Sequence, residues 1–248
     1  MKKALFLDID GVLQPCGQQE RFEHMDELPE ICAHLNKTID TDFDYEAYMN
    51  HSYSNKCDIG AVYFDWDKDA VERLRRILDA TGARIVLSSD WREGGLERMK
   101  GFLAIYGLDK YLDDSTYCIL DSEKNNLEDY SLLREKTEDW RNNLHRIYGR
   151  LCELYPADPN KWFDGVNLRT AEIREYLDRH PEITSFIALD DKNLAKGLDG
   201  HFIQTKNRIL EEDVAQAIEI LNREDGPFLL DETLHTPELQ AWREKYIK

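Results

Sequence analysis

The sequence lacks both a long hydrophobic run and a regular pattern of cysteines. No apolar stretch in its 248 residues approaches the roughly 18 residues that a membrane-spanning helix needs. The apolar run after Lys2 and Lys3 reaches Asp8 too soon for the hydrophobic region of a secretory signal peptide. The five cysteines are odd in number and form no C-x-x-C pair, which is typical of reduced thiols. We therefore expect a cytoplasmic protein without a disulfide framework.

Basic residues are also scarce. Lys and Arg number 32 against 50 Asp and Glu, so the formal net charge is −18. At this charge, long-range attraction to nucleic acid or to an anionic membrane is unfavourable, although a local basic groove would override the average. Nucleic acid is therefore disfavoured as a partner, no membrane contact is expected, and the oligomeric state is left open.

Apolar runs that alternate with helical patterns predict an α/β fold. Apolar runs at 4–7, 84–87 and 185–189 indicate buried strands, and shorter strands are expected at 116–120 and 201–204. Helical spacing predicts a helix that Asp67 or Asp65 caps and Gly82 ends, followed by helices over 96–106, 169–179 and 211–222. Because strand–helix–strand crossovers are right-handed, this order predicts a Rossmann-like parallel sheet.

Two stretches do not fit the alternation and are predicted to be insertions. Residues 14–65 hold eleven acidic and three basic residues, and we expect a flap or lid after the first strand. Its aromatic residues either pack a small core of the lid or, in one or two cases, stack against a substrate. Residues 121–165 carry a helical apolar stripe and are expected to form a cap. The remaining chain divides into a catalytic core, 1–13, 66–120 and 166–222, and a C-terminal extension, 223–248.

Polar side chains directly follow three of the predicted strands. They are Asp8 and Asp10 after the first, with Gly11 next in the chain, Ser88 and Ser89 after the second, and Asp190 and Asp191 after the fourth. Ligands in such sheets bind beyond the carboxyl ends of the strands, where converging carboxylates need a hard cation. Oxygen ligands suit Mg²⁺ better than Zn²⁺, and an aspartate can act as a nucleophile toward phosphorus. The pattern therefore predicts phosphoryl transfer with Mg²⁺ as the cofactor.

This ordered set of residues resembles the haloacid-dehalogenase-like (HAD) superfamily, from the first strand to about residue 222. The resemblance implies that Asp8 is the nucleophile and a metal ligand. It implies that Asp10 is the general acid and base, with its backbone carbonyl on the metal. Asp190 and Asp191 would complete the metal site, with Asp190 the more direct ligand.

The same resemblance implies which groups hold the transferred phosphoryl group. Ser88 matches the position of the phosphoryl-binding hydroxyl, and Ser89 is the alternative if the strand ends one residue later. Arg169 stands where the superfamily usually has a lysine that steadies the negative charge, and Lys192 or Lys196 is the alternative. Contacts with the substrate are expected from Gly11, Ser89 and Arg92.

The second aspartate separates reaction types within the superfamily, because phosphatases carry it and dehalogenases do not. A leaving alkoxide needs a proton, which Asp10 can supply. The run from Ser88 to Arg92 is also similar to HAD domains of bacterial RNA-repair proteins and their stand-alone relatives. We expect a phosphomonoester hydrolase that forms an aspartyl-phosphate from a small phosphorylated metabolite or nucleotide. The alternatives are a nucleic-acid end phosphatase and a non-catalytic HAD-like binding module.

Overall fold

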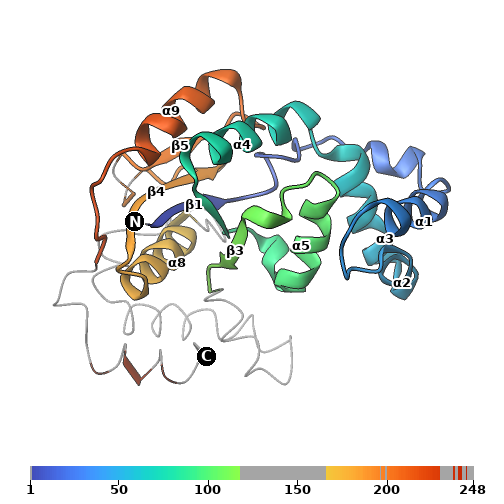
Figure 1. The fold of residues 1–248 in the computed structure, drawn as a ribbon, viewed down its shortest axis with the longest axis horizontal. Coiled ribbons are helices and arrows are strands. Elements are labelled where there is room, and N and C mark those ends of the chain that lie inside the picture. The colour runs from blue at the N-terminus through green and yellow to red at the C-terminus, as the bar shows by residue number, and fades with distance from the viewer. Residues whose placement is uncertain are drawn as a thin grey trace, which may run out of the picture.

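The computed structural model describes residues 2–117, 166–195, 197, 198 and 200–229, and single helical positions at 237, 240, 241 and 244. Five strands form one parallel sheet in the order β3-β2-β1-β4-β5 (Figure 1). They are β1 (Lys2–Leu7), β2 (Arg84–Leu87), β3 (Leu112–Ser115), β4 (Ile183–Asp190) and β5 (Phe202–Gln204). With the helices on its two faces, the sheet confirms the predicted Rossmann-like α/β class.

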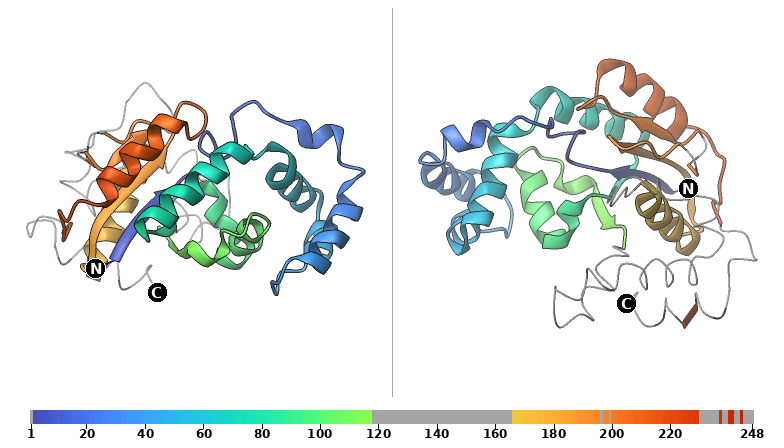
Figure 2. Two further views of the ribbon diagram at one scale, coloured as in Figure 1. Left: turned by 45° about the horizontal axis from the view of Figure 1, so that its top comes forward. Right: turned by 180° about the vertical axis from the view of Figure 1, so that it is seen from behind.

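Strand β1 lies at the centre of the sheet because its side chains are apolar on both faces. Leu5 and Leu7 belong to the hydrophobic cluster that includes helices α4 (Lys68–Thr81) and α9 (Glu211–Leu221). Ala4 and Phe6 belong to a second cluster, with helix α8 (Val166–Arg179). Figures 1 and 2 show α4 and α9 over one face of the sheet and α8 against the other.

No helix in the described part of the chain is both long and apolar enough to cross a membrane.

The local sequence of helix α4 determines where the helix begins, where it ends and which face it packs on the sheet. The carboxylate of Asp67 accepts a hydrogen bond from the Ala70 amide at 2.8 Å, so Asp67 is the N-cap. Gly82 ends the helix in the left-handed conformation, with φ of 67°. The buried face carries the apolar residues at helical spacing that the sequence indicates: Ala70, Val71, Leu74, Ile77 and Leu78.

Two predicted boundaries differ most from the structure. The third strand covers Leu112–Ser115, not 116–120: Thr116 and Tyr117 follow the strand, and 118–120 lie outside the described residues. Helix α8 begins at Val166, so Arg169 lies in its first turn instead of opening it. The predicted cap at 121–165, Lys196 and most of the C-terminal extension also lie outside the described residues.

The 14–65 insertion is helical. It contains the 3₁₀-helix η1 (Glu20–Glu23), helices α1 (Leu28–Thr38), α2 (Tyr45–His51) and α3 (Tyr53–Gly60), and the π-helix η2 (Ala61–Asp65). Its buried residues Leu28, Cys32 and Leu35 belong to the same hydrophobic cluster as Leu5 and Leu7 of β1. The insertion therefore shares the core of the α/β domain.

The insertion docks on helix α5 (Leu96–Ala104), which follows the 3₁₀-helix η3 (Asp90–Gly94) and precedes η4 (Asp109–Tyr111). The Tyr45 hydroxyl donates a hydrogen bond to the Gly101 carbonyl at 2.7 Å, and Phe43 packs edge-on against Phe102, with centroids 5.8 Å apart. Tyr48 also packs on Phe102. These three aromatic residues of the insertion therefore pack against the main domain.

Candidate active site

The carboxyl ends of β1, β2 and β4 bring the polar side chains together. Leu7 pairs with Leu87 on one side and with Leu189 on the other, so the residues that follow lie at one edge of the sheet. The Asp8 amide donates to the Leu189 carbonyl at 3.0 Å, and the Ser88 amide donates to the Leu7 carbonyl at 2.8 Å. Strand pairing thus extends up to Asp8 and fixes its position.

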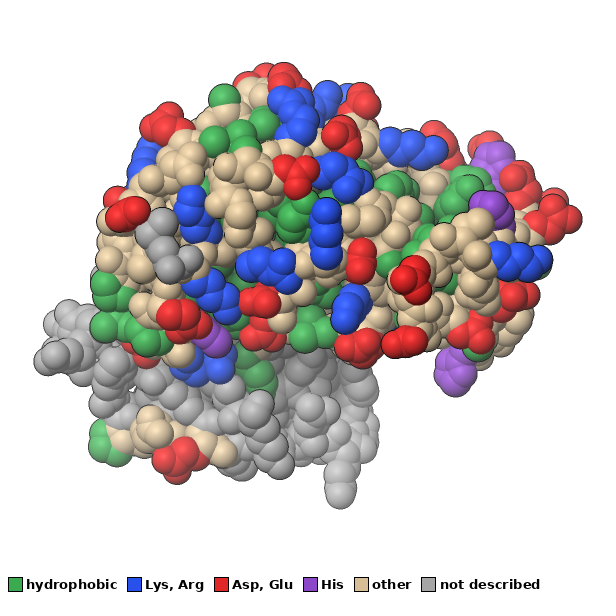
Figure 3. Space-filling model, viewed as in Figure 1, with side chains coloured by type: hydrophobic (Ala, Val, Ile, Leu, Met, Phe, Trp, Pro, Cys, Tyr) green, Lys and Arg blue, Asp and Glu red, His purple; other side chains and the backbone are tan. Residues whose placement is uncertain are grey.

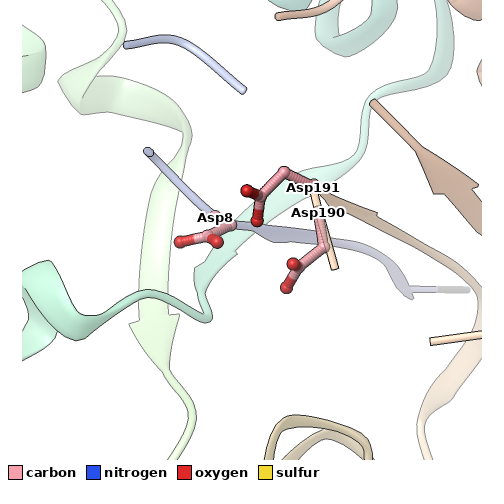
Figure 4. A group of neighbouring side chains, drawn as sticks. All are labelled: Asp8, Asp190 and Asp191. Carbon is pink, nitrogen blue, oxygen red and sulfur yellow. The ribbon is translucent and has the colours of Figure 1, made fainter. Parts of the chain in front are cut away.

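Asp8, Asp190 and Asp191 form a group of three carboxylates, one oxygen of each lying within 4.8 Å of the others (Figure 4). Asp8 and Asp190 are buried and Asp191 is half-buried. Burial raises the pKa of Asp190 to about 7, with Arg169 opposing the rise and Asp8 adding to it. Burial and the charge of Asp8 also raise the pKa of Asp191. Three oxygen donors with excess negative charge fit Mg²⁺, which would favour their ionised forms.

Arg169 supplies the cation that balances two of these carboxylates. Its Nη1 lies 3.2 Å from Asp8 and 3.0 Å from Asp190, and its side chain is 4% exposed. The same nitrogen donates to the Ser88 carbonyl. Burial alone would lower the pKa of Arg169, but the carboxylates of Asp8 and Asp190 outweigh it and raise the pKa above its ordinary value. Arg169 therefore stays charged at the centre of the site.

The alternative cation, Lys192, meets the site through its backbone. Its amide donates to Oδ1 of Asp190 at 2.8 Å, which orients that carboxylate. The other alternative, Lys196, lies outside the described residues. Among the described candidates, the guanidinium of Arg169 is the one whose contacts with Asp8 and Asp190 place it between the strand ends.

The two serines after β2 have different environments. The Ser89 hydroxyl accepts from the Trp91 amide at 3.4 Å and caps helix η3. The Ser88 hydroxyl is buried and has no hydrogen-bond partner within the described residues. A buried hydroxyl without a partner destabilises the folded protein by about 1–3 kcal/mol. Such a hydroxyl is typical of a group that binds a ligand. The geometry favours Ser88 over Ser89 as a phosphoryl-binding group.

Gly11 allows the chain after β1 to pass close to Asp191. Its φ is 73°, and a Cβ at this position would lie 2.5 Å from the Cβ of Asp191. The Thr205 hydroxyl donates to the Gly11 carbonyl at 2.7 Å and ties this turn to the end of β5. Only glycine tolerates both the conformation and the contact.

Asp10 lies outside the group of three carboxylates. Its side chain accepts a hydrogen bond from Nε1 of Trp91 at 3.0 Å. Asp10 is an exposed residue whose carboxyl group is partly desolvated, which raises its pKa; the hydrogen bond from Trp91 opposes this rise, and the charge of Asp8 adds to it. Sequence reasoning missed Trp91; the available signal was a large side chain with an N–H donor three residues after Ser88 in a polar loop.

Arg92, expected from the sequence to contact the substrate, pairs with a side chain of helix α8 in the structure. It is 9% exposed, and its Nη2 pairs with Oε2 of Glu172 in α8 at 2.8 Å. This ion pair joins η3 to the helix that carries Arg169. A contact between Arg92 and the substrate stays a prediction.

The comparisons with known proteins agree with this geometry at the level of a family. No curated protein and no solved structure gives a significant match. The model of one family, described as the HAD domain in Swiss Army Knife RNA repair proteins, matches residues 4–214. That range covers every candidate residue described above and most of the chain. The chain therefore belongs to this family of HAD domains.

Proposed function

We propose that the protein is a Mg²⁺-dependent phosphomonoester hydrolase in which Asp8 is the nucleophile. The observation that carries the proposal is the position of Asp8, a buried carboxylate that contacts the Arg169 guanidinium and lies within the group formed with Asp190 and Asp191. Family membership supports a phosphatase-type hydrolase. Mg²⁺, when held by Asp8, Asp190 and Asp191, would neutralise phosphate charge that otherwise repels the nucleophile.

The first step transfers the phosphoryl group to the protein. An oxygen of Asp8 forms a bond to phosphorus, and the bond between phosphorus and the ester oxygen breaks. Asp10 donates a proton to the departing oxygen, which leaves as an alcohol. Arg169 and the Ser88 hydroxyl hold the phosphoryl oxygens while negative charge moves from Asp8 through the phosphoryl group to the departing oxygen.

The second step returns Asp8 to its starting state. Asp10, now ionised, accepts a proton from a water molecule whose oxygen attacks phosphorus. The bond between phosphorus and Asp8 breaks, and inorganic phosphate is released. Over the two steps, the ester and one water molecule become the alcohol and inorganic phosphate. Asp8 and Asp10 return to their starting protonation states.

The test measures inorganic phosphate released from a panel of phosphate esters with Mg²⁺. Wild type is compared with Asp8→Asn and with Asp69→Asn, a control that changes an 83% exposed aspartate of α4. Turnover by wild type and Asp69→Asn, with none by Asp8→Asn, is the expected result. Normal turnover by Asp8→Asn refutes the nucleophile assignment. No turnover by wild type refutes the hydrolase and favours the non-catalytic binding module.

Two substrate classes remain candidates, and different observations favour them. The net charge of −18 and the pairing of basic side chains with acidic ones favour a small phosphorylated metabolite or nucleotide. On the face that Figure 3 shows, acidic and basic side chains are interspersed. Arg76 pairs with Glu211 at 2.6 Å and Arg208 pairs with Asp67 at 2.8 Å, so these cations are already compensated.

The family description favours the second class, a phosphorylated end of RNA. The two classes differ in their salt dependence, because a polynucleotide contacts the protein through several phosphates and releases counterions. The test compares a 5′- or 3′-phosphorylated oligonucleotide with the matching mononucleotide over a range of salt. A preference for the oligonucleotide that falls steeply with salt supports an end phosphatase. Equal turnover with little salt dependence supports the small substrate.

A further inference from the structure

The side chain of Asp10 is held by a residue to which no role has been assigned. Nε1 of Trp91 donates to Oδ2 of Asp10 at 3.0 Å, across 81 positions of sequence. Asp10 is exposed and follows the buried Asp8 by two residues in the chain. An exposed carboxylate on a turn samples several rotamers unless a donor selects one. The indole N–H is such a donor.

Trp91 is itself held in place by three groups. Its ring packs edge-on against Trp66, with centroids 6.1 Å apart, and against Phe102, at 6.0 Å. Its backbone carbonyl accepts a hydrogen bond from Nη2 of Arg98. Arg98 also donates from Nη1 to Asp58 of the 14–65 insertion at 3.1 Å. The main domain therefore packs directly against the indole, and the insertion supports the Trp91 backbone indirectly, through Arg98.

We propose that Trp91 is a positioning residue that holds the Asp10 carboxyl group toward the ester oxygen that leaves. The inference rests on the proposed function, because it gives Trp91 a task in the same reaction. A proton donor must lie within hydrogen-bond reach of the departing oxygen, and small displacements reduce the rate steeply. Trp91 does not touch the reacting atoms; it acts through Asp10.

Trp91→Phe removes the donor and keeps an aromatic ring between Trp66 and Phe102. Trp66→Phe is a matched control: it removes an indole N–H from the same aromatic cluster. The Nε1 of Trp66 has no hydrogen-bond partner within the described residues, and its ring stacks on Tyr106 at 5.7 Å. Trp66 is buried and Trp91 is partly buried, so the control loses at least as much packing while Phe keeps an aromatic ring against Trp91, and only Trp91→Phe loses the contact with Asp10.

The kinetic test compares two esters that differ in the need for a proton donor. An alkyl phosphate has a poor leaving group and needs general acid catalysis, whereas p-nitrophenyl phosphate releases a stable anion without it. The measured quantity is kcat/KM, because it reports the transfer to Asp8 and excludes the later hydrolysis. Trp91→Phe should lower kcat/KM roughly ten- to a hundredfold for the alkyl ester and less than about threefold for the nitrophenyl ester.

Trp66→Phe should change both esters in the same proportion. An equal loss for the two esters in Trp91→Phe, with wild type active, overturns this inference and leaves the proposed function standing. If wild type turns over neither ester, the proposed function fails instead. A second measurement then decides whether Trp91 holds Asp10 at all.

That measurement uses the NMR resonances of the indole N–H groups, one for each of the five tryptophans. The resonance that disappears in Trp91→Phe belongs to Trp91. In the wild type it should lie downfield, as a hydrogen bond to a carboxylate requires, and it should move upfield in Asp10→Ala. A resonance that keeps its position in Asp10→Ala overturns the inference, whatever the activity.

Discussion

Replacement of Arg169 by methionine tests the charge balance of the site most directly. Methionine keeps much of the apolar stem but removes the guanidinium that pairs with Asp8 and Asp190. Removing one partner of a buried ion pair costs about 3–5 kcal/mol of folding free energy, because the remaining charge is left uncompensated. Two carboxylates lose their partner here, so we expect a loss at the upper end of that range at pH 8.

Mg²⁺ should recover part of this loss. Without the guanidinium the three carboxylates carry a larger uncompensated charge, so a bound cation stabilises the variant more than the wild type. The assay is urea unfolding at pH 8, with and without millimolar Mg²⁺, for wild type, Arg169→Met and Arg76→Met. Arg76 pairs with Glu211 on the surface, and an exposed pair of this kind contributes little to stability, so Arg76→Met should leave the unfolding curve close to that of wild type.

Two results would refute the reasoning. A loss of less than about 1 kcal/mol in Arg169→Met would mean that the buried carboxylates do not depend on the guanidinium. An equal gain from Mg²⁺ in wild type and Arg169→Met would mean that the cation does not bind among those carboxylates.

Three further predictions follow from other contacts. Gly11→Ala should weaken Mg²⁺ binding and cost about 1–3 kcal/mol, because the new Cβ would lie 2.5 Å from that of Asp191; a Mg²⁺ titration followed by melting temperature measures both, and an unchanged midpoint would contradict it. Gly101→Ala should cost about 1–3 kcal/mol in chemical unfolding, since its methyl group would overlap the Phe43 ring; wild-type stability would show that the insertion shifts freely on α5. Burial raises the pKa of Asp190 to about 7, so the folded metal-free protein binds this proton more tightly than the unfolded chain does. Its metal-free stability should therefore lose a contribution as pH rises from about 4 to 7, and Asp190→Asn should lose that pH dependence; an identical slope in the variant would refute the assignment.

The central strands could be predicted from sequence because burial on both faces leaves a local signature. Leu5 and Phe6 point to opposite faces and both are fully buried, so the run has no polar interruption. The cap at Asp67 and the glycine at Gly82 also act within a few residues of their positions. Where the interaction that sets an element is local, the sequence alone predicts it.

The edge strand β3 could not be predicted in the same way. Its sequence is Leu-Asp-Asp-Ser, and within the described part of the chain it pairs with β2 alone. The carboxylate of Asp113 lies 2.9 Å from Nζ of Lys2, and no residue of the strand is buried, so apolar periodicity is absent. Polar edge strands of this kind are common because they prevent pairing with other chains.

The insertion carried signals that periodicity reasoning passed over. Leu28, Cys32 and Leu35 recur at helical spacing and form the buried face of α1. Asp44 and Ser52 each accept a hydrogen bond from an amide three residues later, as N-caps do. The helices are short, so each one contributes only two or three apolar positions to the pattern. Their docking on α5 depends on contacts between residues far apart in sequence.

The candidate site shows the same division between local and distant interactions. Asp8 and Asp190 could be identified because each follows an apolar strand. The hydrogen bond between Trp91 and Asp10 joins two loops, and no spacing within either loop indicates it. The preference for Ser88 over Ser89 also required the structure, because both serines follow the same strand and differ only in their partners.

Two features at this edge of the sheet lower the stability of the folded protein. The Ser88 hydroxyl is buried without a partner in the described chain, and burial disfavours the ionised form of Asp190. Each costs folding free energy when taken alone. Both lie around Asp8, whereas the β1 residues behind it, Ala4 to Leu7, are apolar and fully buried. Such a concentration of unfavourable local choices at one point is expected where a ligand supplies the missing interactions, and here the missing partners are a cation for the carboxylates and an acceptor for the hydroxyl. A phosphate ester bound with Mg²⁺ provides both.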